Sequence, residues 1–350
     1  MPVKVLIVDD SALIRKVLTE ILSEDPDIEV VGTAGDPYIA RNKIKELNPD
    51  MITLDVEMPR MDGIAFLRNL MRLRPMPVLM ISTLTEKGGP ITLEALELGA
   101  VDYVPKPTAD MHGGLFGIAD EIREKVKVVA QARVRPLDPT KLEKKPKVES
   151  LKTDVMGAEY KHGHIIAIGA STGGTEAILE VLLQFPADSP PVMITQHIPM
   201  GFSSTYAQRL NKSCALNVYE ARSGQVIKPG SAYLAPGDDH LQIVRDGVNR
   251  TCRLSSSEKV NRHRPSVDVL FESLAEAQGK NCSAALLTGM GNDGARGLLK
   301  LREAGAHTIA QDQNSCVVWG MPRAAVEMEA AVEVQPLDKV AGALLRAARF

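Results

Sequence analysis

The chain has little of several features that would assign it to a specialised class of protein. Its 350 residues include only four cysteines, which lie far apart and form no C-x-x-C pair typical of a metal site. No segment approaches the ~20 consecutive apolar residues that cross a bilayer. The short apolar run near the start ends in two aspartates, which is typical of a strand and not of a signal peptide. We therefore expect a cytoplasmic protein with reduced thiols.

A strong charge of either sign is also missing. The 41 lysines and arginines nearly balance the 44 aspartates and glutamates, which leaves a net charge of −3. This balance predicts no general affinity for nucleic acid or for membrane surfaces. Apolar residues make up 44% and charged residues 24%, as in ordinary globular proteins. The length favours two domains.

Short apolar runs alternate with amphipathic stretches over residues 1–107 and again from residue 163. This alternation predicts parallel sheets with helices on both faces. A fifth helix is expected near 117–131, and the proline- and lysine-rich stretch that follows has little periodicity. Within the second half, residues 231–255 combine turn signals with short alternating segments and predict antiparallel hairpins.

The predicted fold class is therefore α/β in both halves. The first half is a (βα)5 domain, and the second is a doubly wound, mostly parallel domain with an antiparallel hairpin. The expected bounds are 1–125 for the first domain, 126–162 for the helix end and a flexible linker, and 163–350 for the second domain.

Charged and hydroxyl residues follow the predicted strands of the first half. Ligands of a parallel α/β sheet bind at the carboxyl ends of the strands, where the sequence places Asp9-Asp10, Asp55, Ser82 and Lys106. Three converging carboxylates need a cation, and Mg²⁺ prefers such oxygen ligands. We expect Asp55 to attack a phosphoryl group, with Lys106 and Ser82 contacting that group.

This half resembles the receiver domain of bacterial response regulators, on the Asp9-Asp10 pair and the segments "LDVEMPRMDG", "MIST" and "VPKP". The resemblance implies that a histidine kinase phosphorylates Asp55. It also implies that Mg²⁺ is held by Asp10, Asp55 and the backbone carbonyl of Glu57. A two-state switch read through Ser82 and Tyr103, and a cis bond before Pro107, are implied in the same way.

The second half contains a glycine-rich loop, "GASTGG", between a predicted strand and a predicted helix. The spacing of Gly169, Gly173 and Gly174 does not match the G-x-G-x-x-G of dinucleotide sites. A phosphate-binding P-loop would need a lysine where Thr175 stands. The pattern G-x-S-x-G is satisfied, and it places Ser171 on a sharp strand-to-helix turn.

A nucleophilic serine needs a base and a group that orients the base. Of the seven histidines, His197 is the one that ends a predicted parallel strand, and this strand follows that of Ser171. Two acids remain possible at strand ends, Asp293 and Asp312. We favour Asp293, because Gly289, Gly291 and Gly294 let the backbone fold tightly around it and leave N–H groups for an oxyanion.

These residues resemble the chemotaxis protein-glutamate methylesterase/glutamine deamidase family. The matching segments are "IGASTGGTEA", "QHIPMGFSSTYAQRL", "LAPGDDHLQI", "RPSVDVLF", "LLTGMGNDGARGL" and "SCVVWGMPRAA". The resemblance implies that Ser171 attacks γ-glutamyl methyl esters, and the amides of glutamines, on chemoreceptors. His197 would act as base and then acid, and Asp293 would orient it. The backbone N–H of Met290 would bind the oxyanion, with Thr172 and Gly173 nearby, and no cofactor would be needed there.

Two output modules compete with the hydrolase, one that binds nucleotides and one that binds DNA. A DNA-binding module would need a helix-turn-helix and a basic face, whereas the second half is nearly neutral and shows a βα pattern. Three arginines, Arg209, Arg222 and Arg264, are candidates for contacting an acidic receptor helix. The long polar linker motivates a further hypothesis, in which the first domain inhibits the second until Asp55 is phosphorylated.

Overall fold

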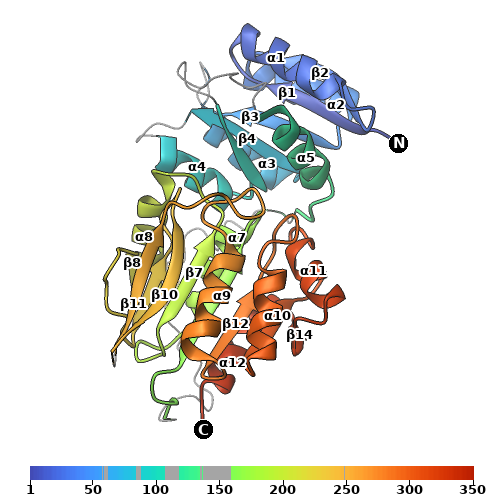
Figure 1. Cartoon of the computed structure of the whole chain (residues 1–350). Helices are drawn as coiled ribbons and strands as arrows, with labels where there is room; N and C mark the ends of the chain where they lie inside the picture. The colour runs from blue at the N-terminus through green and yellow to red at the C-terminus, as the bar shows by residue number, and fades with distance from the viewer. Residues whose placement is uncertain are drawn as a thin grey trace. The chain divides into compact units, whose positions relative to one another are not determined.

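The chain divides into two compact units, Met1–Leu142 and Glu143–Phe350. Figure 1 shows the computed structural model. The structure describes residues 1–56, 58, 62–83, 88–106, 118–134, 136, 159–247 and 249–350. Within these ranges, no helix combines the length and the apolar character needed to cross a membrane.

The first unit is a five-stranded sheet with its helices. Its strands are β1 (Val3–Val8), β2 (Ile28–Ala34), β3 (Met51–Asp55), β4 (Val78–Thr83) and β5 (Asp102–Lys106). Its helices are α1 (Ala12–Ser23), α2 (Pro37–Leu47), α3 (Gly63–Leu73), α4 (Gly88–Glu97) and α5 (Ala119–Ala130).

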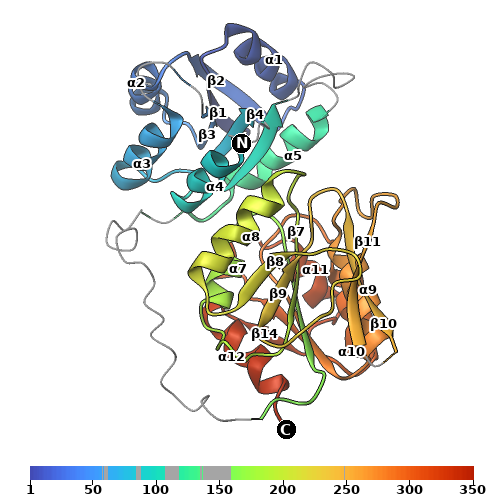
Figure 2. The same cartoon turned by 90° about the vertical axis from the view of Figure 1, so that its left-hand side faces the viewer.

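The five strands are all parallel, in the order β2-β1-β3-β4-β5. Helices α1 and α5 cover one face, and α2, α3 and α4 cover the other (Figure 2). Because both faces are covered, β3 is buried along its whole length and β1 from Val5 onward. Side chains cap three helices: Ser11 accepts from a backbone N–H of α1, Asp36 from α2 and Asp62 from α3.

The second unit contains a larger parallel sheet and a separate hairpin. The sheet strands are β6 (Ile165–Ala170), β7 (Val192–Gln196), β8 (Asn217–Glu220), β9 (Ser231–Leu234), β12 (Cys282–Leu286), β13 (His307–Gln311) and β14 (Glu333–Gln335). The hairpin strands are β10 (His240–Asp246) and β11 (Asn249–Ser255). The helices are α7 (Gly174–Leu182), α8 (Phe202–Ser213), α9 (Val267–Gln278), α10 (Ala295–Glu303), α11 (Met321–Glu327) and α12 (Leu337–Ala347).

All seven sheet strands are parallel, in the order β14-β13-β12-β6-β7-β9-β8. The chain winds outward from β6 through β7, then returns to β12 and winds outward in the other direction. Strands β6 and β12 are therefore neighbours at the point where the winding reverses. In open α/β sheets, the crevice beyond such a switch point is where ligands bind.

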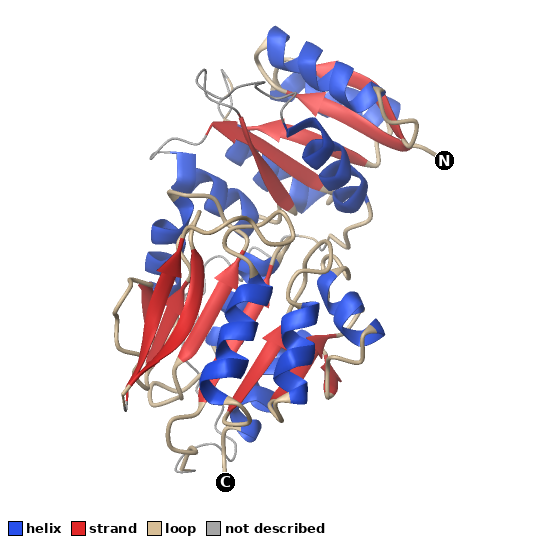
Figure 3. Ribbon diagram, viewed as in Figure 1, coloured by secondary structure: helices blue, strands red, loops and turns tan. Residues whose placement is uncertain are grey.

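Helices lie on both faces of this sheet, as the blue and red ribbons of Figure 3 show. Helices α9, α10 and α11 cover one face, and α7, α8 and α12 the other. The antiparallel hairpin β10–β11 packs against α9, and its apolar side chains Leu241, Ile243 and Cys252 join the core beneath the helices. The core thus fixes the hairpin relative to the carboxyl edge of the sheet.

The predicted fold class is confirmed in both halves, while one local prediction is wrong. Residues Ser231–Leu234 do not form part of a hairpin; they are β9, a buried strand parallel to both β7 and β8. An alternating segment predicts a strand but not its direction. The side chains of β9 are buried along its whole length because both faces of the parallel sheet are covered. Most of the predicted linker lies outside the described residues.

Candidate functional site

The turn that carries Ser171 joins β6 to α7 and is tightly packed. A Cβ atom at Gly169 would lie 2.2 Å from a methyl group of Val267, and Gly173 has a φ of +74°. The backbone N–H of Gly174 donates to the carbonyl of Ser171 over 2.7 Å. Glycine is required where a side chain would collide or where φ is positive. These glycines therefore serve the geometry of the turn.

Two neighbouring strands hold Ser171 from either side. Its N–H donates to the carbonyl of Thr288, in the loop after β12, over 3.0 Å. Its carbonyl accepts from the side-chain Nε2 of Gln196, the last residue of β7, over 2.9 Å. With both backbone groups bound, Ser171 is fixed at the switch point of the sheet.

His197 connects Ser171 to Asp293. Its Nδ1 lies 3.0 Å from Ser171 Oγ, and its Nε2 lies 2.8 Å from Asp293 Oδ2. The ionised carboxylate of Asp293 accepts a hydrogen bond from the Nε2–H group, which assigns the Nε2–H tautomer to the neutral ring. Nδ1 then presents a lone pair to the hydroxyl of Ser171. The predicted serine, histidine and aspartate therefore form one continuous hydrogen-bonded chain.

Asp293 is almost fully buried and is held by several donors. Asn261 Nδ2 and Ser266 Oγ each donate to its Oδ1 over 2.7 Å, and the N–H of Val267 donates to Oδ2 over 2.6 Å. Burial alone would raise the pKa of Asp293, but the hydrogen bonds from His197, Asn261 and Ser266 outweigh it. They hold this pKa well below its usual range, so the carboxyl group is ionised.

A second buried carboxylate lies beside Asp293. Asp268 accepts from Asn261 Nδ2 over 2.8 Å and from the N–H of Gly297 over 2.6 Å. Burial raises the pKa of Asp268, and the charge of Asp293 raises it further. The Asn261 amide thus lies between two carboxylates and donates to both.

Neither Asn261 nor Asp268 was among the site residues predicted from the sequence. Asp268 and Ser266 belong to the segment "RPSVDVLF", which contributed only to the family resemblance. The alternative acid, Asp312, accepts from the N–H and the hydroxyl of Ser315. It is Asp293, not Asp312, that contacts His197.

The predicted oxyanion residues lie on the two loops that meet at Ser171. Thr172 and Gly173 follow it directly, and Gly173 is the N-cap of α7. Met290 lies in the loop after β12, next to Gly289, where a Cβ atom would lie 2.7 Å from Ser171 Cβ. The two loops are therefore in close contact, and the positive end of the α7 dipole faces the same region.

Two of the three predicted receptor-contacting arginines have partners within the second unit. Arg209 Nη2 lies 2.8 Å from Glu176 Oε1. Arg264 pairs with Asp238 over 2.9 Å and also donates to backbone carbonyls of the loop after β11. Arg222 is exposed; it follows β8 by two residues and begins a turn in which the N–H of Gln225 donates to its carbonyl. Contact of any of them with a receptor stays a prediction.

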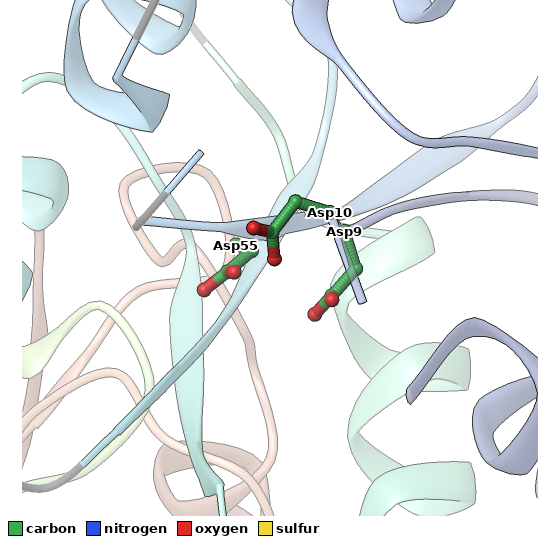
Figure 4. A group of neighbouring side chains, drawn as sticks. All are labelled: Asp9, Asp10 and Asp55. Carbon is green, nitrogen blue, oxygen red and sulfur yellow. The ribbon is translucent and has the colours of Figure 1, made fainter. Parts of the chain in front are cut away.

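An acidic cluster occupies the carboxyl edge of the first unit (Figure 4). Asp9, Asp10 and Asp55 each offer a carboxylate oxygen, and these atoms lie within 4.8 Å of one another. Lys106 Nζ lies 2.7 Å from Asp9 Oδ2 and 2.8 Å from Asp55 Oδ2. The desolvated ammonium is kept charged by these partners, because the two carboxylates outweigh burial and raise the pKa of Lys106.

The structure describes only some of the other residues predicted at this edge. Tyr103 is buried in β5, which raises the pKa of its hydroxyl well above the usual value. Ser82 lies near the end of β4, in register with Pro105, and its side chain is outside the described part of the chain. Glu57 and Pro107 also lie outside the described residues.

The cluster fits a hard divalent cation. Asp9 and Asp55 are buried while Asp10 is exposed, so the group of oxygen ligands opens toward solvent on one side. One lysine balances only one of the three negative charges, and carboxylate oxygens are ligands that Mg²⁺ prefers. The donor set therefore agrees with the metal expected from the sequence.

Comparisons with known proteins agree with this arrangement in both units. Residues 5–112 match the response regulator receiver domain family, and residues 166–344 match the CheB methylesterase family. A protein-glutamate methylesterase/protein-glutamine glutaminase of Xanthomonas campestris is 55% identical, with 98% of this chain and 97% of the relative covered. A second, from Pseudomonas aeruginosa, is 54% identical over 99% of this chain and 97% of the relative.

A solved structure provides a structural comparison for the second unit. The catalytic domain of the Thermotoga maritima CheB methylesterase is 37% identical, with a TM-score of 0.52; the match covers 53% of this chain and 99% of that domain. The family resemblance predicted from the sequence is thereby confirmed. The chain belongs to the protein-glutamate methylesterase/protein-glutamine glutaminase family, in which a response regulator receiver domain precedes the CheB methylesterase domain.

Proposed function

We propose that the second unit hydrolyses the γ-methyl esters of glutamate residues, and the γ-amides of glutamine residues, on chemoreceptors. Ser171 is the nucleophile, His197 the general base and acid, and Asp293 the group that orients the base. The observation that carries the proposal is the hydrogen-bonded chain from Ser171 through His197 to Asp293, with distances of 3.0 and 2.8 Å. The two alternative functions of the second unit, nucleotide binding and DNA binding, are not favoured.

The first half of the reaction forms an acyl-enzyme. His197 Nδ1 removes the proton of Ser171 as Oγ attacks the γ-carbonyl carbon, and the imidazolium keeps its Nε2–H on Asp293. The oxyanion forms beside the start of α7, where the N–H groups of Met290, Thr172 and Gly173 are the proposed donors. The intermediate collapses when Nδ1–H protonates the leaving group, which departs as methanol from an ester and as ammonia from an amide.

The second half releases the product. His197 Nδ1 removes a proton from water, and the resulting hydroxide attacks the acyl carbon. The second tetrahedral intermediate then expels Ser171, which regains its proton from His197, and a glutamate γ-carboxylate is left on the receptor. Esters and primary amides pass through the same type of oxyanion, so one site serves both substrates.

For the first unit, we propose that a histidine kinase transfers a phosphoryl group to Asp55. The Asp55 carboxylate attacks phosphorus, and Lys106 and Ser82 contact the phosphoryl oxygens. Asp10, Asp55 and the backbone carbonyl of Glu57 would hold Mg²⁺, which neutralises charge on the phosphoryl group when bound. Ser82 and Tyr103 are the proposed switch residues.

The same proposal links the two activities. Phosphorylation of Asp55 raises the hydrolytic activity, because the unphosphorylated receiver domain is inhibitory. Three further points remain predictions from the sequence. They are the domain bounds 1–125, 126–162 and 163–350, the cytoplasmic location, and the absence of nucleic-acid partners. Methanol release from methylated receptor membranes, with and without a small-molecule phosphodonor, tests the function. A rate that is independent of Ser171 would contradict it.

A further inference from the structure

A second histidine lies flat against His197. The rings of His197 and His263 are stacked, with centroids 3.7 Å apart and an angle of 15° between their planes. His263 ends a tight turn that begins at Val260, and the backbones of these two residues exchange hydrogen bonds of 3.1 and 2.9 Å. His263 is not among the site residues predicted from the sequence, and it lies outside the segments that carry the family resemblance.

The stack restrains a rocking motion of the His197 ring that its two hydrogen bonds do not restrain. The bonds to Ser171 and Asp293 are made at the two ring nitrogens, whose lone pair and N–H lie in the plane of the imidazole. They resist sliding of the ring within that plane, but rocking about the line between them strains them little. The χ2 torsion of histidine is itself broad and imposes no sharp preference. A ring in contact with one face opposes this rocking directly.

The turn that carries His263 is anchored to the same site. Asn261, two residues earlier, donates to both Asp293 and Asp268. Asn261 and Arg262 have φ values of +51° and +68°, so the turn has a defined left-handed conformation. On the other side of His263, Arg264 pairs with Asp238. His263 is thus held by its neighbours on both sides and is a fixed surface for His197.

We propose that His263 is a positioning residue, whose ring keeps the His197 imidazole in the plane that reaches Ser171 and Asp293 together. The proposal rests on the proposed function of these three residues. A ring on this face also excludes water from it, which strengthens the two hydrogen bonds. His263 acts through His197 and makes no bond to the reacting ester.

Three substitutions in the full chain separate stacking from other roles. His263→Phe keeps an aromatic ring without ring nitrogens, His263→Asn keeps a polar group without a ring, and His263→Ala removes both. Exposed His162, which carries no stacked partner in the described structure, provides the controls His162→Phe, His162→Asn and His162→Ala. Methanol release from methylated receptor membranes gives kcat and KM for each, normalised to the folded fraction from Trp319 fluorescence.

Stacking predicts that His263→Asn and His263→Ala lower kcat about tenfold while KM changes less than about threefold. His263→Phe retains kcat within about threefold of the parent chain. The NMR signal of the His197 Nε2–H, hydrogen-bonded to Asp293, persists in the Phe variant and broadens in the Asn and Ala variants. A purely structural role would lower the folded fraction and leave the kcat of the folded protein unchanged, which contradicts the proposal.

Two results overturn the inference. One is a His263→Phe variant as impaired as His263→Asn, because this assigns the role to a hydrogen bond of His263. The other is an unchanged kcat in all three variants. Ser171→Ala, measured beside them, separates this inference from the function itself. If Ser171→Ala is inactive while the His263 variants are normal, only the inference fails; if Ser171→Ala is active, the proposed function fails.

Discussion

Asp268 and Asp293, two buried carboxylates, accept hydrogen bonds from one side-chain nitrogen of Asn261, over 2.8 and 2.7 Å. Burial of two neighbouring acids is unfavourable unless donors compensate for the lost water. The Asn261 amide is such a donor for both. The turn that carries Asn261, which follows the β10–β11 hairpin, therefore helps to hold Asp293 in place.

Replacing Asn261 by glycine tests this support. Glycine adopts the φ of +51° without strain, so the change removes the amide and leaves the backbone conformation accessible. We expect a loss of about 1–3 kcal/mol in the free energy of unfolding, because two buried carboxylates lose a donor. We also expect a lower kcat, since Asp293 orients His197.

The matched control for this substitution is Arg262→Gly. It relaxes the backbone at the neighbouring residue, whose φ is +68°, and leaves the Asn261 amide in place. Urea unfolding followed by Trp319 fluorescence gives the stabilities, and methanol release gives kcat. Equal losses in the two variants would show that the turn, and not the amide, supports the site.

A histidine remote from the site predicts a pH dependence of stability. His164 is buried at the amino end of β6, where its Nε2 lies 3.1 Å from Ser283 Oγ. Burial, together with the charge of Lys161, lowers the pKa of His164 to about 4. In the unfolded chain the His164 ring takes up a proton at its usual pKa of about 6.5, whereas in the folded chain it does so only near pH 4. Stability should therefore fall as the pH drops through this window, by at most about 3 kcal/mol.

The variant His164→Gln retains a polar side chain that cannot titrate. We expect its free energy of unfolding to change less than that of the parent chain between pH 7 and pH 5. The sole tryptophan, Trp319, lies in the second unit and reports its unfolding. The same pH slope in both chains would show that His164 does not cause it.

Metal dependence provides a test of the first unit. The ligand atoms of Asp9, Asp10 and Asp55 lie within 4.8 Å of one another, so phosphorylation should require a divalent cation. Chelation with EDTA should abolish labelling by a small-molecule phosphodonor, and added Mg²⁺ should restore it. Asp10→Asn should raise the Mg²⁺ concentration needed for half-maximal labelling, whereas Asp36→Asn, at a helix cap, should not. Labelling of equal extent in EDTA would rule out the metal site.

Much of the arrangement follows from the sequence, because parallel strands bring their carboxyl ends to one edge. Ser171 and His197 could be paired since they end consecutive strands, and β6 and β7 are indeed neighbours. The same rule predicts that Asp55 and Lys106 lie close together, and their side chains form an ion pair. The supporting turn could not be predicted, because residues 256–266 have no periodicity and Asn261 contacts Asp293 across a separation of 32 residues. The stack between His197 and His263 likewise joins residues with no common strand or helix.

The central claim is that Ser171 performs covalent catalysis on a glutamyl ester. Methanol release from methylated receptor membranes by the Ser171→Ala variant of the full chain tests it most directly. We predict a loss of about 10⁴-fold or more, with unchanged unfolding by Trp319 fluorescence and unchanged phosphodonor labelling of the first unit. Methanol release within about tenfold of the parent chain, by a folded Ser171→Ala protein, would contradict the account.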